Sequence, residues 1–152
     1  MITTVCIGII AAIFFGDLWI KNYIEKNVAE GSEKKLLGGS LLIRRHHNKG
    51  MALNWGDKKR SLVAIVSVVF TVVMFAVFIC SFGQRGNNLL RVGLALLLGG
   101  GFSNTYDRLK RKYVVDYVSF GVKWQGLRKI VFNCSDFCIM IGALLTAIGA
   151  YK

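Results

Sequence analysis

Four long apolar runs alternate with polar connections along this chain. The apolar runs cover residues 2–24, 61–82, 89–106 and 130–151. The run at 61–82 is free of charged residues, and a helix of its length, rising 1.5 Å per residue, crosses a hydrocarbon core of about 30 Å. The pattern therefore predicts four transmembrane helices in a single integral membrane domain, residues 1–152.

The polar connections also contain strand-like stretches. Residues 40–55 alternate apolar and polar segments around Asn48, Lys49 and Gly50, which predicts a hairpin with its turn at these three residues. Residues 113–120 alternate in the same way and are a candidate partner strand. We expect an all-α membrane protein with a small extracytoplasmic β-element built from the first and third loops.

Composition agrees with a membrane protein. The chain is 54% hydrophobic with a mean hydropathy of +0.50, well above ordinary soluble domains. A net charge of +12 would suggest nucleic acid in a soluble chain. Here the basic residues lie between apolar runs too long for a soluble core, so anionic membrane lipid is the expected partner and nucleic acid is not.

The cysteines and histidines give no pattern typical of a metal site. The four cysteines lie in apolar runs without a CxxC pair, so we interpret them as apolar fillers, although Cys134 and Cys138 are one helical turn apart. His46 and His47 are adjacent and would point to opposite faces of a strand, which argues against joint metal binding. We expect no metal and no cofactor.

Polar side chains gather at one end of the predicted helices. An even number of spans places both termini on one side and the first and third loops on the other. The side of those two loops then receives Asp17, Lys21, Asn48, Asn104, Asp107, Arg108, Asp116, Asn133 and Asp136. Scattered lipid-facing charges would have no reason to converge, so we expect one site between the helix ends.

Two aspartates are the candidate catalytic pair. Asp136 lies inside the otherwise uncharged run 130–151, where an ionisable side chain indicates function. Asp116 supplies a second carboxyl group, and two neighbouring carboxylates cannot both ionise cheaply, so one holds a proton while the other accepts one. Asp107 is next to Arg108, and we interpret it as an ion-paired structural carboxylate. Asp17 and Lys21 are four residues apart on one helix face and can pair.

These residues resemble the motifs of lipoprotein signal peptidase, also called signal peptidase II. The resemblance covers nearly the whole chain in five ordered motifs: Asp17 with Lys21; Asn48, Gly50 and Ala52; Asn104, Asp107 and Arg108; Val114, Val115, Asp116 and Tyr117; and Phe132, Asn133 and Asp136. Four positions depart from the family pattern. Ser103 replaces a glycine, Ser135 replaces an alanine, and Met51 and Leu53 stand where the first-loop motif usually has Ala and Phe, changes expected to affect substrate preference more than chemistry.

The resemblance implies a membrane aspartic endopeptidase that cleaves prolipoproteins before a diacylglyceryl-modified cysteine. Asp116 and Asp136 would be catalytic, while Asn48, Gly50, Asn104, Arg108 and Asn133 would support substrate and carboxylates, and Asp17 with Lys21 would anchor the first helix. The enzyme would be a multi-pass protein, expected as a monomer, of the bacterial cytoplasmic (inner) membrane, with its active site at the outer face.

The charge distribution opposes that orientation. The first and third loops hold 16 of the 20 Lys and Arg residues, and the positive-inside rule would place them in the cytoplasm. We give the motifs precedence over this rule, because an active site in the outer leaflet could use basic groups to hold anionic lipid.

Two other classes of function compete with the peptidase. A small four-helix ion-coupled transporter could relay cations through Asp17, Asp107 and Asp136, with a helix break at residues 99–101. A carrier should have polar groups near mid-bilayer and a repeat relating its halves, whereas this chain has its polar groups at one face. An assembly partner without chemistry would leave the pair of Asp116 and Asp136 unexplained.

Overall fold

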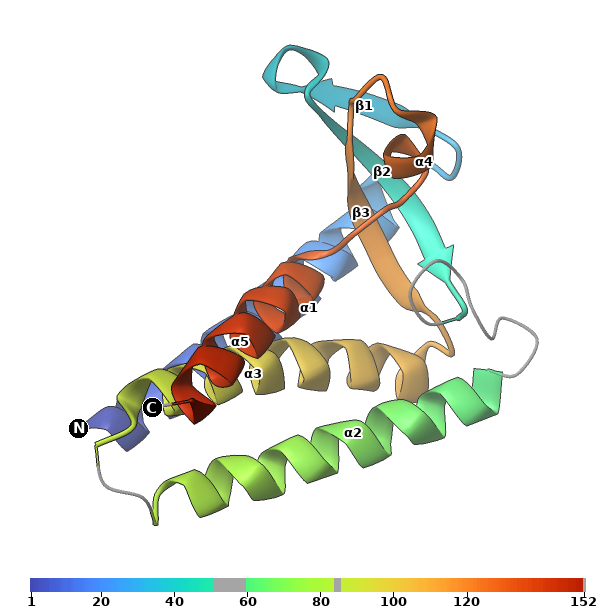
Figure 1. Cartoon of the computed structure of the whole chain (residues 1–152). Coiled ribbons are helices and arrows are strands. Elements are labelled where there is room, and N and C mark those ends of the chain that lie inside the picture. Colours follow the sequence, from blue (N-terminus) through green and yellow to red (C-terminus); the bar gives the residue numbers. More distant parts are fainter. Residues whose placement is uncertain (51–59, 84–85, 152) are drawn as a thin grey trace.

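The structure is a computed structural model that describes residues 1–50, 60–83 and 86–151. Its elements, in chain order, are α1 (Ile2–Asn27), β1 (Glu33–Leu36), the 3-10 helix η1 (Leu37–Gly39), β2 (Leu41–Asn48), α2 (Arg60–Ser81), α3 (Asn88–Lys110), β3 (Val114–Phe120), α4 (Gln125–Arg128) and α5 (Cys134–Ala150). The sheet lies at one end of the long helices and both chain termini lie at the other end (Figure 1).

Helix α3 is the centre of the helical layer. It packs against α1, α2 and α5, and its buried residues run from Leu90 to Asp107. The other three long helices bury one side against it and expose large apolar side chains on the other, including Trp19 of α1, Ile65 of α2 and Leu144 of α5. Apolar surface of this extent indicates contact with lipid.

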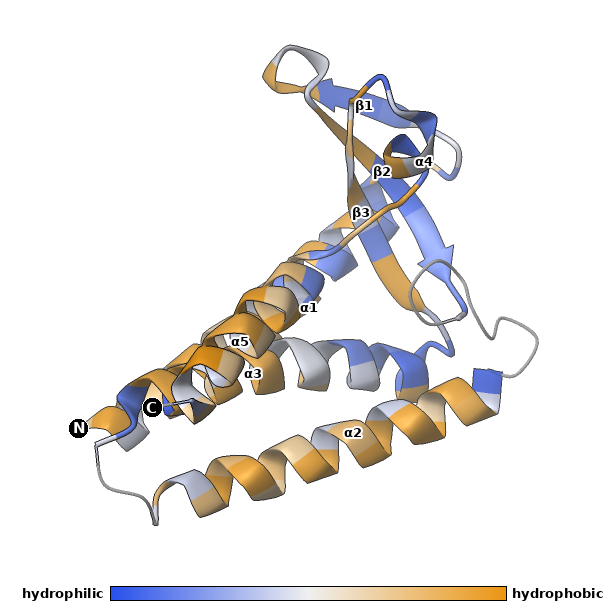
Figure 2. Ribbon diagram, viewed as in Figure 1, coloured by the Kyte–Doolittle hydropathy of each residue, from blue (hydrophilic) through white to orange (hydrophobic). Residues whose placement is uncertain are grey.

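Hydropathy divides the molecule along its length. The long helices are mostly hydrophobic, whereas β1, the second half of β2 and the end of α3 nearest the sheet are mostly hydrophilic (Figure 2). Among the described residues, α1 and α2 are the two helices long and apolar enough to cross a membrane by themselves. Helix α5 is apolar but has only 17 residues, and α3 carries several charges. The helical fold with a small β-element agrees with the sequence prediction, while four separate spans stay a prediction.

The three strands form one antiparallel sheet in the order β1-β2-β3. Strands β1 and β2 form a hairpin through η1, a turn that the sequence did not predict, while the predicted turn at Asn48, Lys49 and Gly50 stays a prediction. Gly38 and Gly39 in η1 have positive φ angles of 66° and 93°, a conformation that glycine adopts readily. The second half of the predicted hairpin, residues 51–55, lies outside the described residues. Strand β2 instead pairs with β3, which joins the first and third loops as expected.

The two faces of the sheet have different neighbours. Tyr117 and Val115 lie on the face that packs against Ile24 of α1. On the same face, His47 Nε2 lies 2.7 Å from Glu25 Oε1 of α1. His46 is the cross-strand partner of Asp116, so both side chains lie on the opposite face. The prediction that the two adjacent histidines face opposite sides is confirmed.

Helix α5 begins at Cys134, although the apolar run that predicts it begins at Ile130. Phe132 pairs with Val118 as an isolated bridge, in which Phe132 N–H donates to the Val118 carbonyl at 2.7 Å. This contact holds the residues before the helix in an extended conformation beside β3. The helix then starts with a capping box, because Asn133 and Asp136 each accept a backbone N–H from the other. The bridge and the cap together bring the first turn of α5 to Asp116.

Candidate active site

Asp116 and Asp136 face one cavity from different elements. Asp116 is in β3 and Asp136 is in the first turn of α5. Asn133 bridges them, because its side-chain amide donates to Asp116 Oδ1 at 2.7 Å and its backbone N–H donates to Asp136 Oδ2 at 2.9 Å. The two carboxyl groups that the sequence predicts as a pair are therefore brought together.

Asp116 is almost completely buried, with 2% of its surface exposed. It accepts a second hydrogen bond from Asn48 Nδ2 at 3.0 Å, next to that of Asn133. Burial, followed by the charge of Asp136, raises the pKa of Asp116 from 3.8 to about 7, although the two amide donors oppose this shift. One proton can therefore reside on the carboxyl pair near neutral pH.

Asp136 is oriented by two N–H donors. Besides the Asn133 backbone, Asn104 Nδ2 donates to Asp136 Oδ1 at 3.0 Å. Asn104 lies on α3, so this contact holds the beginning of α5 in register with the central helix. The carboxyl group of Asp136 thus has both oxygens engaged and a fixed orientation toward the cavity.

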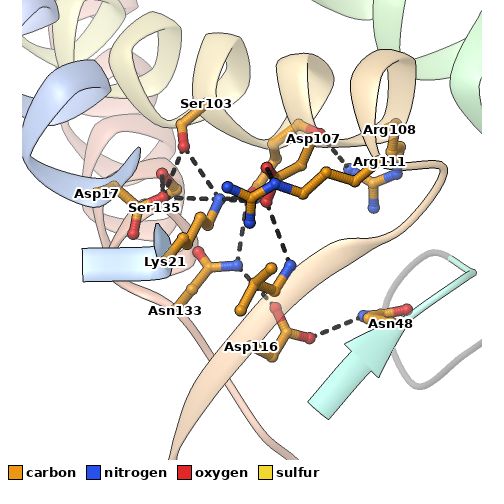
Figure 3. A network of polar contacts seen from close by, with 12 residues as sticks. Asp17, Lys21, Asn48, Ser103, Asp107, Arg108, Arg111, Asp116, Asn133 and Ser135 are labelled. Atoms are coloured by element: carbon orange, nitrogen blue, oxygen red, sulfur yellow. Dashed lines mark hydrogen bonds and ion pairs between the residues drawn. The ribbon is translucent and has the colours of Figure 1, made fainter. Parts of the chain in front are cut away.

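Lys21 lies at the centre of a buried polar network that includes Asp17, Ser103 and Asp107 (Figure 3). Its ammonium group is fully buried and lies 2.8 Å from Asp17 Oδ2 and 3.2 Å from Asp107 Oδ2. It also donates to Ser103 Oγ at 3.0 Å and to Asn104 Oδ1 at 2.9 Å. Two carboxylates therefore hold the Lys21 ammonium group inside the protein, and the predicted pairing with Asp17 is confirmed.

Asp107 has partners other than the one predicted. Its carboxylate contacts Lys21 and Arg111, the latter at 3.3 Å, and accepts the Val115 backbone N–H at 3.2 Å. Arg108 instead donates to two backbone carbonyl groups, those of Asn104 at 3.4 Å and Gly50 at 3.2 Å. Asp107 is therefore ion-paired, as expected, but with Lys21 and Arg111 in place of Arg108.

Three hydroxyl groups complete the network and were not predicted as site residues. Ser103 donates to Asp17 Oδ2 at 2.7 Å, Ser135 donates to the same oxygen, and Tyr117 donates to Asp17 Oδ1 at 2.9 Å. Burial, and then the charge of Asp17, raises the pKa of Tyr117, which keeps it a hydrogen-bond donor. A serine in an apolar helix commonly bonds its own backbone, so sequence gives only a weak signal for such a role.

Two of the four departures from the family pattern lie in this network, while Met51 and Leu53 lie outside the described residues. Ser103 and Ser135 are fully buried and hold a carboxylate of α1. Their hydroxyl groups point into the buried network, and the expected effect on substrate preference stays a prediction.

The cavity at the carboxyl pair has a volume of about 320 Å³. Asn48, Asn104 and Arg108 provide its polar wall together with Asp116 and Asp136. The other side is apolar and is formed by Val114, Ile130, Val131, Phe132, Ile139 and Met140. A cavity with polar and apolar lining residues suits a ligand that is itself partly polar and partly apolar.

The remaining expectations for the site concern metals and one motif residue. Within residues 1–50, 60–83 and 86–151, no three His, Cys, Asp or Glu side chains converge to hold a metal ion. Gly50 is buried, and its backbone N–H donates to Asn48 Oδ1 at 3.1 Å. Ala52 of the same motif lies outside the described residues.

Sequence comparisons agree with the motif resemblance. The sequence model of the family described as signal peptidase (SPase) II matches residues 9–152. The chain is 32% identical over 137 residues to a lipoprotein signal peptidase of Lactobacillus johnsonii, which covers 90% of this chain and 84% of the relative. It is 28% identical over 144 residues to a lipoprotein signal peptidase of Lactiplantibacillus plantarum. This alignment covers 95% of this chain and 92% of the relative.

The fold is also that of known membrane enzymes. Two solved structures, described as bacterial membrane enzymes studied by the in meso method at 2.3 Å and 1.9 Å resolution, superpose with TM-scores of 0.82 and 0.81. Both are 23% identical to this chain, and each superposition covers 98% of it. The superpositions cover 88% of the first structure and 94% of the second. Because the family model covers nearly the whole chain, the protein belongs to the signal peptidase II family and is a membrane peptidase.

Proposed function

We propose that this protein is an aspartic endopeptidase that removes the signal peptide from prolipoproteins by cleaving before a diacylglyceryl-modified cysteine. The observation that carries the proposal is the bridging of Asp116 and Asp136 by Asn133 at the wall of one cavity. The names of the relatives support the class of substrate.

The two carboxyl groups act as a pair that shares one proton. The ionised carboxylate removes a proton from a water molecule, and the water oxygen attacks the carbonyl carbon before the modified cysteine. The protonated carboxyl group donates its proton to the carbonyl oxygen as the tetrahedral intermediate forms. On collapse, the amine nitrogen of the cysteine leaves with a proton from the pair. The raised pKa of Asp116 supports a singly protonated pair at neutral pH.

The surrounding amides hold the pair in its reactive geometry. Asn48 and Asn133 orient Asp116, while Asn104 orients Asp136. Arg108 lines the same cavity and, with the Gly50 carbonyl fixed against it, is placed to bind the substrate backbone. Asp17 and Lys21 anchor α1 beneath this layer and act through Asn104.

The apolar wall of the cavity provides a place for the lipid-modified part of the substrate. Ile139 and Met140 of α5 line this wall, and 60% of the Met140 surface is exposed on the lipid-facing side of the helix. A diacylglyceryl chain could therefore enter from the bilayer without crossing the polar sheet.

We place the sheet outside the cytoplasm and the four long helices across the inner membrane, with both termini in the cytoplasm. The hydrophilic end of the molecule in Figure 2 supports one common side for the two basic loops. The orientation is tested by replacing Lys34 or Lys123 with cysteine and treating intact cells with a membrane-impermeant thiol reagent. The unsubstituted chain is the control. Labelling only after permeabilisation would place both loops inside.

We also propose that the protein works as a monomer in contact with anionic lipid. Lys49, Arg60, Arg108 and Lys112 line a cavity of about 380 Å³ between the beginning of α2 and the end of α3. Four cations around one cavity favour an anion such as a lipid phosphate. Activity in vesicles with anionic lipid should exceed that in zwitterionic vesicles, and equal activities would contradict this partner.

The decisive experiment incubates the purified protein with a diacylglyceryl-modified prolipoprotein and follows loss of the signal peptide. We expect the wild type to release the signal peptide and the variants Asp116→Asn and Asp136→Asn to release none. Folded wild-type protein that leaves the substrate intact would contradict the proposal and return attention to the ion-coupled transporter.

A further inference from the structure

A second cavity lies on the sheet side of the carboxyl pair. Its volume is about 210 Å³, and it shares Asn48, Asp116, Ile130 and Val131 with the apolar cavity. Asp116 therefore belongs to the wall between two spaces. A chain bound across this carboxylate would place one part in each cavity.

The second cavity differs from the first in its chemistry. Its remaining lining residues are His46 of β2, Gly126 of α4 and Lys129, the residue that follows α4. His46 is opposite Asp116 in the strand register, so its ring stands beside the carboxyl group on the same face of the sheet. Lys129 is exposed at the rim.

Both basic side chains are available to a ligand. Within the described part of the chain, neither the His46 ring nor the Lys129 ammonium group has a side-chain hydrogen bond or ion pair. Glu33, an acidic residue on the neighbouring strand β1, is already paired with Arg44 and Arg128. An ammonium group donates three hydrogen bonds and a histidine ring at least one, so the cavity offers donors and positive charge.

The direction of the substrate follows from the two environments. The signal peptide and the lipid chains are apolar and match the wall formed by Phe132, Ile139 and Met140. The polypeptide after the modified cysteine is polar and leaves the membrane, so it matches the cavity on the sheet side. The cleaved bond then lies at Asp116, between the two.

We propose that His46 and Lys129 form a subsite that binds the first residues after the cleavage site and prefers an acidic side chain there. This inference rests on the proposed function. It assigns these two residues to substrate selection, a role that neither the sequence motifs nor the buried network gives them.

The test compares matched substrates that differ in a single charge. Diacylglyceryl-modified prolipoprotein peptides carry Asp or Asn at each of the first three positions after the modified cysteine, and kcat/KM is measured for the full-length protein. An exposed ion pair predicts that the Asp substrate is preferred roughly two- to fivefold at one of these positions. Lys129→Glu should reverse the preference, and His46→Gln should reduce it.

Lys123→Glu is the matched control, because Lys123 is exposed on the same connection, outside the lining of the cavity, and the change in net charge is the same. It should leave both activity and preference unchanged. If Lys129→Glu does not fold, Lys129→Gln should reduce the preference instead of reversing it.

The possible failures are distinguishable. Efficient cleavage by the wild type with equal kcat/KM for every Asp and Asn substrate would overturn the subsite and leave the proposed function intact. The same holds if Lys123→Glu changes the preference as much as Lys129→Glu, since that result would indicate a general surface charge. Absence of cleavage of every substrate by folded wild type would overturn the proposed function and the subsite together.

Discussion

The Lys21 ammonium group donates a 2.9 Å hydrogen bond to the side-chain oxygen of Asn104. An ammonium group has no acceptor, so this contact fixes the amide with its oxygen toward Lys21 and its nitrogen toward Asp136. Asn133 donates to the same oxygen at 3.2 Å and reinforces that orientation. The buried ion network of α1 thereby positions one of the two carboxyl groups at the cavity.

Removal of this amide should slow catalysis. Asn104→Ala deletes a hydrogen bond to a charged group, and such bonds are worth about 1.5–3 kcal/mol, so kcat should fall roughly 10- to 100-fold. Asn133→Ala should be at least as harmful, because Asn133 contacts both carboxyl groups and also caps α5. Wild-type rates in both variants, measured with a lipid-modified prolipoprotein, would contradict the support roles.

The carboxyl pair should be far more sensitive than the structural carboxylate. Asp116→Asn and Asp136→Asn preserve side-chain shape but remove the shared proton, and loss of general acid–base catalysis commonly lowers kcat by about 10² to 10⁴. Asp107→Asn should act mainly on stability, because Asp107 contacts Lys21 and Arg111 away from the lining of the cavity. A nearly active Asp116→Asn beside an inactive, folded Asp107→Asn would transfer the catalytic role to Asp107.

Loss of the central cation should destabilise the fold. Lys21→Met leaves Asp17 without its ammonium partner in a fully buried site, and breaking a buried ion pair costs about 3–5 kcal/mol. Lys26→Met is the matched control, since Lys26 is exposed on the same helix. In detergent, the melting temperature should decrease strongly for Lys21→Met and change little for Lys26→Met. Equal melting temperatures would show that the network contributes nothing to stability.

Activity should depend on pH through the carboxyl pair. The pKa of Asp116 is raised to about 7, so the singly protonated pair is lost as pH rises above that value and kcat/KM should fall there. At low pH the second carboxylate also takes a proton, which gives a bell-shaped profile. A flat kcat/KM between pH 6 and 9 would contradict a shared proton.

The same shift predicts a change in stability. Asp116 in the folded protein keeps a proton that the unfolded chain releases near its ordinary pKa of 3.8. The folded state therefore binds more protons between about pH 4 and 7, and the free energy of unfolding should decrease as pH rises through this range. Asp116→Asn removes the titrating group and should reduce this dependence.

Helices α3 and α5 pack too closely at Gly100 to accommodate an added methyl group. A Cβ at Gly100 would lie 2.5 Å from the Ser135 carbonyl oxygen and 2.9 Å from Ile139, so Gly100→Ala must push the first turns of α5 and shift Asp136. Such overpacking typically costs about 1–3 kcal/mol. Gly16→Ala is the control, because a Cβ there meets nothing within 4 Å. Activity and thermal stability should decrease in the first variant alone.

The sequence by itself determined the features that depend on neighbours along the chain. Apolar runs located the four long helices, since length and hydropathy decide which segments can be buried in lipid. Spacing of four residues predicted the ion pair of Asp17 with Lys21. These relationships follow from helix geometry, which is the same wherever the helix lies.

Tertiary structure alone decided which distant groups meet. The hairpin of β1 and β2 turns through η1, and the pairing of β2 with β3 sets the register that puts His46 opposite Asp116. Ser103 and Ser135 reach Asp17 only because α1, α3 and α5 pack side by side. Strand register and helix packing depend on side chains far apart in the sequence, so no local pattern could specify them.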